Sequence, residues 1–228
     1  MADYPDEEHV VKIIEATNVT HNVKRFKLTK PENYVFTPGQ ATDIVINSPQ
    51  WKTERRPFTF TSLNEWNNLE FTIKIYSDHE GVTNQLGQLK AGDELILHDI
   101  WGAINYKGEG VFIAGGAGIT PFIAIFRQLQ KDGKLGNNKL IFSNRTSKDI
   151  ILKEEFEKML GNNFINTLTD EKSEKYDNRK IDESYLKEKL NNFSQYFYIC
   201  GPDPMIESIS EQLLKLGVEE DRIVKEQF

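Results

Sequence analysis

The sequence contains very little cysteine and more acidic than basic residues. The single cysteine among 228 residues, Cys200, excludes an internal disulfide framework, a cysteine-ligated iron–sulfur cluster and a zinc finger. The 28 lysine and arginine residues are outnumbered by 35 aspartate and glutamate residues, which leaves a net charge of -7. A surface of that sign is unsuited to nonspecific nucleic-acid binding. We therefore expect no metal site and no nucleic-acid partner.

Long hydrophobic runs and a secretion signal are also missing. The apolar stretches are short and broken by charge, so none reaches the roughly 20 residues of a membrane span. The first ten residues, MADYPDEEHV, are acidic and lack the basic-then-apolar order of a signal peptide. These features predict a cytoplasmic protein without a membrane span, and we expect it to be a monomer.

The first half of the chain reads as closely spaced β-strands. Across residues 10–100, β-branched and aromatic segments are separated by turn signals. The expected strands are VVKIIEATNVT, VKRFKL, ATDIVIN, RPFTFTS, LEFTIKIY and DELILHDI. A short helix is expected at 82–89, where Leu86 and Leu89 share a face. This spacing favours an antiparallel barrel or sandwich.

After Gly108 the pattern changes to alternating strands and helices. Residues 111–114 form a fully apolar run, as expected of a strand buried on both faces. Residues 121–130 then place apolar side chains at helical spacing. The alternation continues through strand KLIFS, helix ILKEEFEKML, strand FINTLT, helix ESYLKEKL, strand YFYIC, helix PMIESISEQLLKL and strand RIVKE. It predicts a doubly wound α/β domain with a parallel sheet, and residues 171–179 are expected to be an exposed loop.

The segment GGAGITP, residues 115–121, joins the first strand of this half to its first helix. Its glycines permit a tight turn and the close approach of a ligand to the backbone. We expect Thr120 to cap the helix and Pro121 to be its first residue, so that the free N–H groups at the helix start face a pyrophosphate. Pro121 stands where a third glycine would complete the dinucleotide fingerprint, and an ordinary strand–helix turn is the alternative.

The loop after the second strand of this half, NRTSK at 144–148, bears on the choice of nucleotide. An acid at that place typically bonds the ribose 2′-hydroxyl of NAD, but none occurs here before Asp149. Arg145 and Lys148 therefore favour the 2′-phosphate of NADPH over NADH, with solvated surface charges as the alternative.

Four segments together resemble the ferredoxin–NADP reductase family of flavin-dependent oxidoreductases. RPFT, residues 56–59, is similar to its Arg-x-Tyr-Ser flavin motif, and GVTNQL, residues 81–86, to its Gly-x-x-Ser/Thr turn. GGAGITP resembles its nucleotide loop, and CGPDPM, residues 200–205, its Cys-Gly-Pro segment. The resemblance covers nearly the whole chain. It implies a flavin-binding antiparallel β-barrel, residues 1–106, followed by an NAD(P)-binding α/β domain with a doubly wound parallel sheet, residues 107–228.

The resemblance gives a reason for the cation, aromatic ring and hydroxyl that meet in RPFT. Arg56 would bind a flavin phosphate, Phe58 would stack on the isoalloxazine ring, and Thr59 would offer its hydroxyl near N5. Strand alternation alone puts Thr59 on the face opposite Arg56 and Phe58, so its role rests on the resemblance. Phe58 and Thr59 replace the tyrosine and serine of the family pattern.

The other site residues are also implied by the resemblance. Thr59, Cys200 and Glu226 are assigned to catalysis, with Cys200 shaping the nicotinamide pocket and Glu226 stabilising charge near the rings. Phe228 would cover the exposed face of the flavin, and a frayed C-terminal tail is the alternative. The residues assigned to cofactor binding are Arg56, Pro57, Phe58, Thr59, Ile73, Lys74, Ile75, Gly81, Val82, Thr83, Gly116, Gly118, Thr120, Pro121, Arg145, Cys200, Gly201, Pro202 and Phe228.

The predicted function is the transfer of a hydride from NADPH to bound FAD, with FMN less favoured, and then of single electrons to ferredoxin or flavodoxin. One alternative is an NADH-dependent reductase component of an oxygenase, or a reductase of free flavin or ferric complexes. An alternative of another class is a non-catalytic flavin-binding electron-transfer subunit. The complete GGAGITP and CGPDPM segments argue against that last alternative, whereas the electron acceptor stays open.

Overall fold

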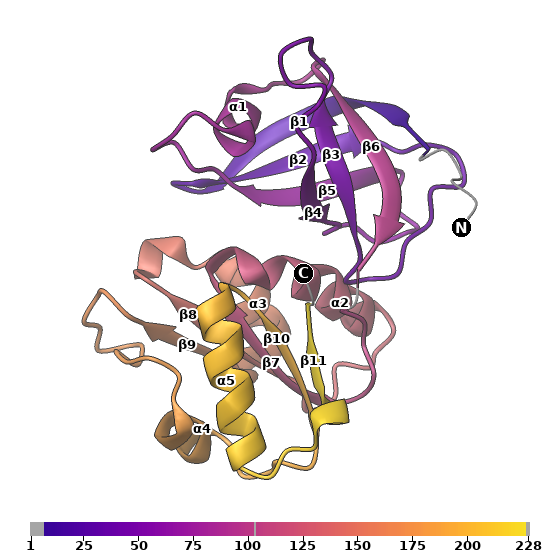
Figure 1. Ribbon diagram of the computed structural model, residues 1–228. Helices are drawn as coiled ribbons and strands as arrows, with labels where there is room; N and C mark the ends of the chain where they lie inside the picture. Colours follow the sequence, from indigo (N-terminus) through magenta and orange to yellow (C-terminus); the bar gives the residue numbers. More distant parts are fainter. Residues whose placement is uncertain (1–6, 103, 227–228) are drawn as a thin grey trace. The chain divides into compact units, whose positions relative to one another are not determined.

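The structure is a computed structural model that describes residues 7–102 and 104–226. The chain divides into two compact units, Met1–Gly102 and Ala103–Phe228 (Figure 1). Each unit has its own sheet and its own apolar core. In the described part of the chain, no helix has the length and apolar content that crossing a membrane requires.

The first unit is a six-stranded antiparallel sheet in the order β4-β3-β6-β1-β2-β5. Its elements are β1 (His9–Thr20), β2 (Val23–Thr29), β3 (Ala41–Ile46), β4 (Arg56–Thr59), β5 (Asn68–Lys74), α1 (Val82–Gln88) and β6 (Glu94–Trp101). A bridge between Phe60 and Phe71 brings the two end strands of the sheet together, as the predicted barrel requires. Phe60 also packs on Phe36 with a ring separation of 4.1 Å, so the closure lies in the aromatic core.

The expected strand RPFTFTS is shorter in the structure, because β4 ends at Thr59. Up to that residue the strand pairs with β3, through contacts such as Ala41 opposite Thr59. Phe60 takes part in both pairings: its N–H donates to the Gln40 carbonyl at 3.1 Å, and it forms the bridge with Phe71. The next residue pairs with β5, where the Thr61 N–H donates to the carbonyl of Glu70 at 2.8 Å. The alternating pattern therefore continues across a corner where the chain changes its partner strand.

Helix α1 packs on the barrel through residues of β2 and of the segment that follows β5. Its buried residues are Val82 and Leu86. Gly87 permits close packing, since a Cβ atom there would lie 2.8 Å from Ile75 Cγ2. Lys24 of β2 donates to the carbonyls of Gly87 and Leu89 at 2.6 and 3.3 Å, which places a cation at the C-terminal end of the helix.

The second unit is a five-stranded parallel sheet in the order β11-β10-β7-β8-β9, which confirms the predicted doubly wound α/β fold. Its strands are β7 (Gly110–Gly115), β8 (Lys139–Asn144), β9 (Phe164–Leu168), β10 (Tyr196–Cys200) and β11 (Ile223–Lys225). Its α-helices are α2 (Thr120–Lys131), α3 (Lys153–Leu160), α4 (Glu183–Lys189) and α5 (Asp203–Lys215). All six residues of β7 are buried, as expected of a central parallel strand.

Helices cover both faces of this sheet (Figure 1). On one face, Phe112 of β7 contacts Phe122 and Phe126 of α2, and Phe126 contacts Phe156 of α3. On the other face, the strands share an apolar cluster with α4 and α5 that includes Tyr185. Because the helices bury both faces, the polar groups of the sheet's carboxyl edge lie in the loops that follow β7, β8, β9 and β10.

Candidate functional site

The loop after β7 is shaped by glycines. It forms a single 3₁₀ turn, η1 (Gly116–Ile119), that leads directly into α2. Gly116 has a φ of +52°, in the left-handed region that favours glycine. A Cβ atom on Gly118 would lie 2.3 Å from the carbonyl oxygen of Cys200 and 2.5 Å from the nitrogen of Gly201. Only a residue without a side chain allows this approach, so the glycine loop packs directly on the backbone of the CGPDPM segment.

The contact between the two segments is made from both sides. A Cβ atom on Gly201 would lie 3.1 Å from the nitrogen of Gly115, and one on Gly115 would lie 2.4 Å from Met205 Sδ. Cys200 ends β10, and Pro202 is the N-cap of α5. Two sequence motifs separated by about eighty residues are thus adjacent at the carboxyl edge of the sheet, where α/β domains bind nucleotides.

Cys200 and Glu226, both predicted to be catalytic, are also neighbours. Cys200 is 5% exposed, and its Sγ lies 3.6 Å from Glu226 Oε2, as a thiol donor to a carboxylate acceptor. Burial, followed by the nearby charge of Glu226, raises the pKa of the Cys200 thiol well above its ordinary value. Burial likewise raises the pKa of Glu226. The thiol is therefore neutral at neutral pH, which suits a group that positions a ring and not a nucleophile.

The start of α2 differs from the prediction. Thr120 is the first helical residue and Ile119 is the N-cap, so Thr120 is not the cap and Pro121 is not the first residue. The Thr120 hydroxyl donates to the carbonyl of Ala117 at 3.0 Å. The cause is η1, whose 3₁₀ turn already has helical geometry and advances the helix start by one residue. No side chain caps η1 or α2, and neither has an acid in its first turn.

The RPFT residues lie on β4, an end strand of the barrel sheet. The Arg56 guanidinium is half exposed and donates to the carbonyl of Arg55 at 2.6 Å and to Glu54 Oε2 at 3.1 Å. An ion pair this exposed is weak, so Arg56 is able to exchange Glu54 for a phosphate. Pro57 is exposed, whereas Phe58 and Thr59 are half-buried, and Phe58 packs against the barrel core.

The remaining barrel residues of the predicted flavin site lie on β5 and α1. Ile73 and Lys74 end β5, beyond its bridge to Phe60, and their strand pairing in the described chain is with β2. The other backbone edge of these two residues is therefore where a ligand would meet polar groups. Ile75 follows the strand and donates its N–H to the carbonyl of Asn22. Gly81 is the N-cap of α1, with Val82 and Thr83 in the first turn, and no side chain caps this end. The residues of β4, β5 and α1 described above therefore suit a cofactor that has a phosphate and an extended polar edge.

The loops after β8 and β9 were only partly anticipated. Arg145 Nε donates to Asp170 Oδ2 at 2.9 Å, and the Asp170 N–H donates to the Arg145 carbonyl at 2.9 Å. Ser147 donates both its N–H, at 2.8 Å, and its hydroxyl, at 3.0 Å, to Glu171 Oε2. Hydrogen bonds from the Thr169 and Arg145 side chains lower the pKa of Asp170, which is therefore ionised at neutral pH. Arg145, expected to meet a 2′-phosphate, thus has an acidic partner in the neighbouring loop.

The signal for these acids was present in the sequence. The expected ribose-binding acid was sought after the second strand of the unit, but Asp170 and Glu171 come two and three residues after the end of the third, β9. Parallel neighbours end at the same sheet edge, so an acid after β9 reaches the loop after β8. Phe228, the remaining predicted site residue, lies outside the described residues. Within residues 7–102 and 104–226, no group of three His, Cys, Asp or Glu side chains is placed to hold a metal ion.

Comparison with known proteins accounts for both units. Residues 10–106 match the oxidoreductase FAD-binding domain, and residues 112–211 match the oxidoreductase NAD-binding domain. NADH-cytochrome b5 reductase 1 of Rattus norvegicus is 26% identical over 254 residues, which cover 93% of this chain and 83% of that protein. A probable dihydroorotate dehydrogenase B (NAD(+)) electron transfer subunit of Pyrococcus furiosus is 32% identical over 203 residues, covering 88% and 73% of the two chains.

Solved structures with the same fold include two of nearly equal length. The FAD/NAD-binding domain of the Vibrio cholerae nitric oxide dioxygenase has a TM-score of 0.85 at 22% identity, covering 96% of this chain and 98% of that one. A ferredoxin NADP+ reductase of Neisseria gonorrhoeae, with FAD and NADP bound, has a TM-score of 0.81 at 19% identity, covering 96% and 97%. The chain therefore belongs to the ferredoxin–NADP reductase family, as an oxidoreductase with an FAD-binding and an NAD-binding domain.

Proposed function

We propose that this oxidoreductase transfers a hydride from NADH to its bound FAD and then passes electrons, one at a time, to a separate carrier protein. The observation that carries the proposal is the direct packing of Gly118 on Cys200 and Gly201. It joins the two nucleotide segments into one surface at the carboxyl edge of the parallel sheet. We propose residues 1–106 and 107–228 as the two functional domains, supported by the limits of the two family matches.

In the nucleotide half, the chain's own residues bind and orient the donor. The backbone of Gly116–Ile119 would receive the pyrophosphate, because the turn has no capping side chain and no acid to compete with it. Cys200 would contact the nicotinamide as a neutral group, and because Cys200 is buried, it would exclude water from the side of the ring that it contacts. Glu226, which accepts from the Cys200 thiol, holds the orientation of that thiol.

In the barrel half, the proposed contacts divide between charge and shape. Arg56 would bind a phosphate of FAD in place of Glu54, and Phe58 would support the ring from its partly exposed side. The outer edge of β5 at Ile73 and Lys74 would offer backbone groups, and Gly81, Val82 and Thr83 would contact the phosphates. Bound FAD supplies the chemistry of accepting an electron pair and releasing single electrons.

NADH is proposed as the donor because carboxylates already occupy the expected 2′-phosphate site. A 2′-phosphate approaching Arg145 would have to displace the ionised Asp170. It would find the N–H and hydroxyl of Ser147 already bonded to Glu171. The 2′-hydroxyl of NADH instead can donate a hydrogen bond to such carboxylates. The names of several relatives, including the reductase of Rattus norvegicus above, also specify NADH.

The acceptor is proposed to be a separate one-electron carrier protein. A single cysteine cannot hold an iron–sulfur cluster, so a cluster that takes part in the reaction would be held outside these 228 residues. Ferredoxin and flavodoxin were the carriers expected from the sequence. The relatives are named as reductases of cytochrome b5 and as an electron transfer subunit, so a haem protein or a partner dehydrogenase is a further candidate.

The test is anaerobic mixing of the FAD-loaded protein with NADH or NADPH. We expect NADH to bleach the visible absorbance of the flavin rapidly, on the order of seconds or faster. NADPH is expected to bleach it more slowly. Absence of bleaching by both nucleotides would overturn the proposal and favour a flavin subunit that exchanges electrons only with another protein. Reoxidation of the bleached protein by a ferredoxin, a flavodoxin and a b-type cytochrome in parallel then ranks the acceptors.

A further inference from the structure

The loop that carries Asp170 and Glu171 folds back on the strand from which it starts. It runs through residues 169–181, between β9 and α4, and returns at Asp177 to form a bridge with Thr167. The Leu168 N–H donates to the Asp177 carbonyl at 2.8 Å. The Thr167 hydroxyl donates to the carbonyls of Asp177 and Arg179. The predicted exposed loop is therefore held at its far end against the edge strand of the sheet.

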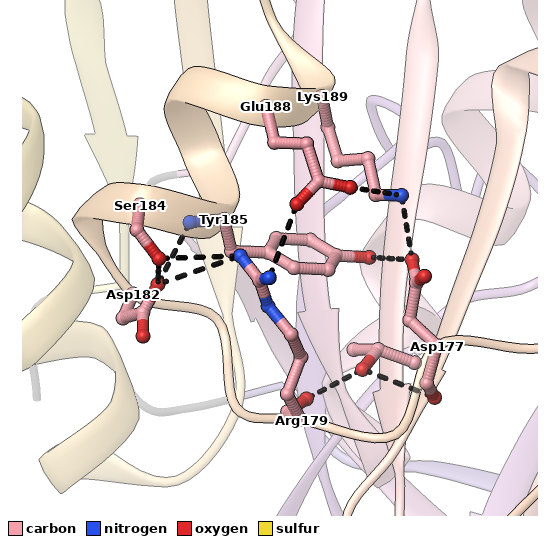
Figure 2. Close-up of polar contacts among 8 residues, drawn as sticks. Asp177, Arg179, Asp182, Ser184, Tyr185, Glu188 and Lys189 are labelled. Atoms are coloured by element: carbon pink, nitrogen blue, oxygen red, sulfur yellow. Dashed lines mark hydrogen bonds and ion pairs between the residues drawn. The ribbon is translucent and has the colours of Figure 1, made fainter.

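A polar cluster around Tyr185 anchors this far end (Figure 2). The Tyr185 hydroxyl donates to Asp177 Oδ2 at 3.0 Å, and Lys189 Nζ lies 3.0 Å from the same oxygen. The Tyr185 ring is fully buried, and the Arg179 guanidinium lies 4.8 Å from its centroid. Arg179 in turn bonds Glu188 of α4 at 3.1 Å. Helix α4 and the loop thus contact each other from Asp177 onward, seven or more residues after Asp170.

Asn178 connects the anchored end with the acidic end. Its Nδ2 atom donates to the Leu168 carbonyl at 2.9 Å and to the Glu171 carbonyl at 2.7 Å. These two bonds use both protons of the amide. The opposite side of the same segment is fixed by the N–H groups of Thr169 and Asp170, which donate to the carbonyls of Asn144, at the end of β8, and of Arg145. The backbone of residues 168–171 is therefore held from two sides. On the side of the returning loop, the Asp177 carbonyl holds Leu168, and the Asn178 side chain is the group that reaches Glu171.

We propose that Asn178 is a positioning residue for the discrimination between NADH and NADPH. Its amide holds the backbone of Glu171 where the Glu171 carboxylate reaches both donors of Ser147. Without these bonds, the hydrogen bonds between Ser147 and the Glu171 carboxylate break more readily. The N–H and hydroxyl of Ser147 can then donate to a 2′-phosphate. The inference rests on the proposed preference for NADH. It adds that the preference depends on a side chain that acts through its hydrogen bonds to two backbone carbonyls.

The test replaces Asn178 by alanine and, separately, by leucine, which keeps a similar size and removes both donors. The second-order rate constant for flavin reduction is measured anaerobically with NADH and with NADPH, and the binding of NAD+ and NADP+ is measured by calorimetry. Both variants lose two part-exposed hydrogen bonds. The ratio of the rate constant with NADH to that with NADPH is therefore expected to fall by roughly three- to tenfold, because the rate constant with NADPH rises.

Two variants of the same cluster serve as controls. Ser184→Ala removes two exposed bonds of this hydroxyl, to Asp182 at 2.8 Å and from Arg179 at 3.3 Å. Neither bond reaches Glu171, so the ratio is expected to stay unchanged. Tyr185→Phe removes the bond to Asp177 and is expected to lower the ratio less than the Asn178 variants, although it unfolds at lower urea concentration. A ratio that follows stability across these variants, or that is unchanged in both Asn178 variants, overturns the positioning role.

A reference variant separates this failure from failure of the proposed function. Asp170→Asn combined with Glu171→Gln removes both charges and keeps the acceptor oxygens. If it lowers the ratio while the Asn178 variants do not, the preference stands and the role of Asn178 is overturned. If it leaves the ratio unchanged, the two acids do not set the preference, and this inference is overturned with that assignment. The proposed function itself is overturned only if neither nucleotide bleaches the flavin of the unsubstituted protein.

Discussion

The loops after β7 and β8 leave the same edge of one parallel sheet, yet they present different surfaces to an anion. The loop after β7 consists of glycine backbone packed on Cys200 and Gly201, with no acid in its first turn. The loop after β8 has its donors already in use: Thr146 donates its N–H and hydroxyl to Asp149, and Ser147 donates its pair to Glu171. The first loop has no acidic side chain in its turn, whereas carboxylates of the chain itself bind the donors of the second.

The difference shows that donor groups alone do not define a phosphate site. Both loops offer backbone N–H groups at the start of a 3₁₀ turn, and the second offers hydroxyls as well. What distinguishes them is whether an internal anion satisfies those donors before a ligand arrives. A dinucleotide with a pyrophosphate but no 2′-phosphate would need the donors of the first loop and would meet no electrostatic repulsion at the second.

The largest expected effect comes from breaking the loop after β7. In Gly118→Ala the new Cβ would lie within 2.5 Å of three backbone atoms of Cys200 and Gly201, so the two segments must separate. We expect a loss of stability of about 3 kcal/mol. A displacement of this size is also expected to slow flavin reduction by NADH roughly a hundredfold. Urea unfolding and anaerobic stopped-flow absorbance measure the two effects.

Gly133→Ala is the matched control for that substitution. Gly133 has a φ of +65° with no neighbouring atom within 4 Å of an added Cβ, so alanine meets backbone strain and no clash. It is expected to cost about 1 kcal/mol and to leave the rate of flavin reduction unchanged. Equal rate losses in the two variants would show that the contact with Cys200 is not what the nucleotide needs.

The next effect comes from making the loop after β8 resemble the loop after β7. In Asp170→Asn combined with Glu171→Gln, both carboxylates are replaced by neutral amides. The amide oxygens can still accept the hydrogen bonds that Arg145 and Ser147 donate. Removing two negative charges within a few ångströms of a 2′-phosphate is expected to raise kcat/KM for NADPH roughly tenfold or more. The value for NADH should change much less. Higher ionic strength should reduce the gain, because these groups are partly exposed; a gain equal for both nucleotides would contradict the assignment.

The sequence predicted the fold well because its signals are local. Alternating and helical periodicities follow from which face of an element is buried, so the observed strands and helices differ from the expected ones by only a few residues at their ends. The exception is RPFTFTS, where one continuous pattern spans a change of partner strand at Phe60. No local signal marks that change, since Phe58 and Phe60 face the same core on either side of it.

The candidate site was predictable where short motifs fix the backbone. GGAGITP and CGPDPM specify turns at strand ends, and the parallel topology alone brings them to one edge. The pairing of Arg145 with Asp170 depends on side chains 25 residues apart, in the loops that follow two adjacent strands, so a single sequence does not reveal it. The helix start at Thr120 was missed for a related reason, because propensity favours threonine as a cap and does not anticipate the preceding 3₁₀ turn.

The smallest effect concerns the pH dependence of stability beside the loop after β7. Burial raises the pKa of Glu226 above 4.5, so the folded chain binds this proton more tightly than the unfolded chain does. The free energy of unfolding therefore falls as pH rises from about 4.5 through the folded-state pKa, and this contribution is constant above it. Glu226→Gln keeps an acceptor for the Cys200 thiol but cannot ionise, and should remove that part of the fall. Urea unfolding followed by circular dichroism over this pH range, with the exposed Glu220→Gln as control, measures it. If the slope persists in Glu226→Gln, another buried group is responsible, and the Cys200–Glu226 pair does not set the electrostatics of this edge.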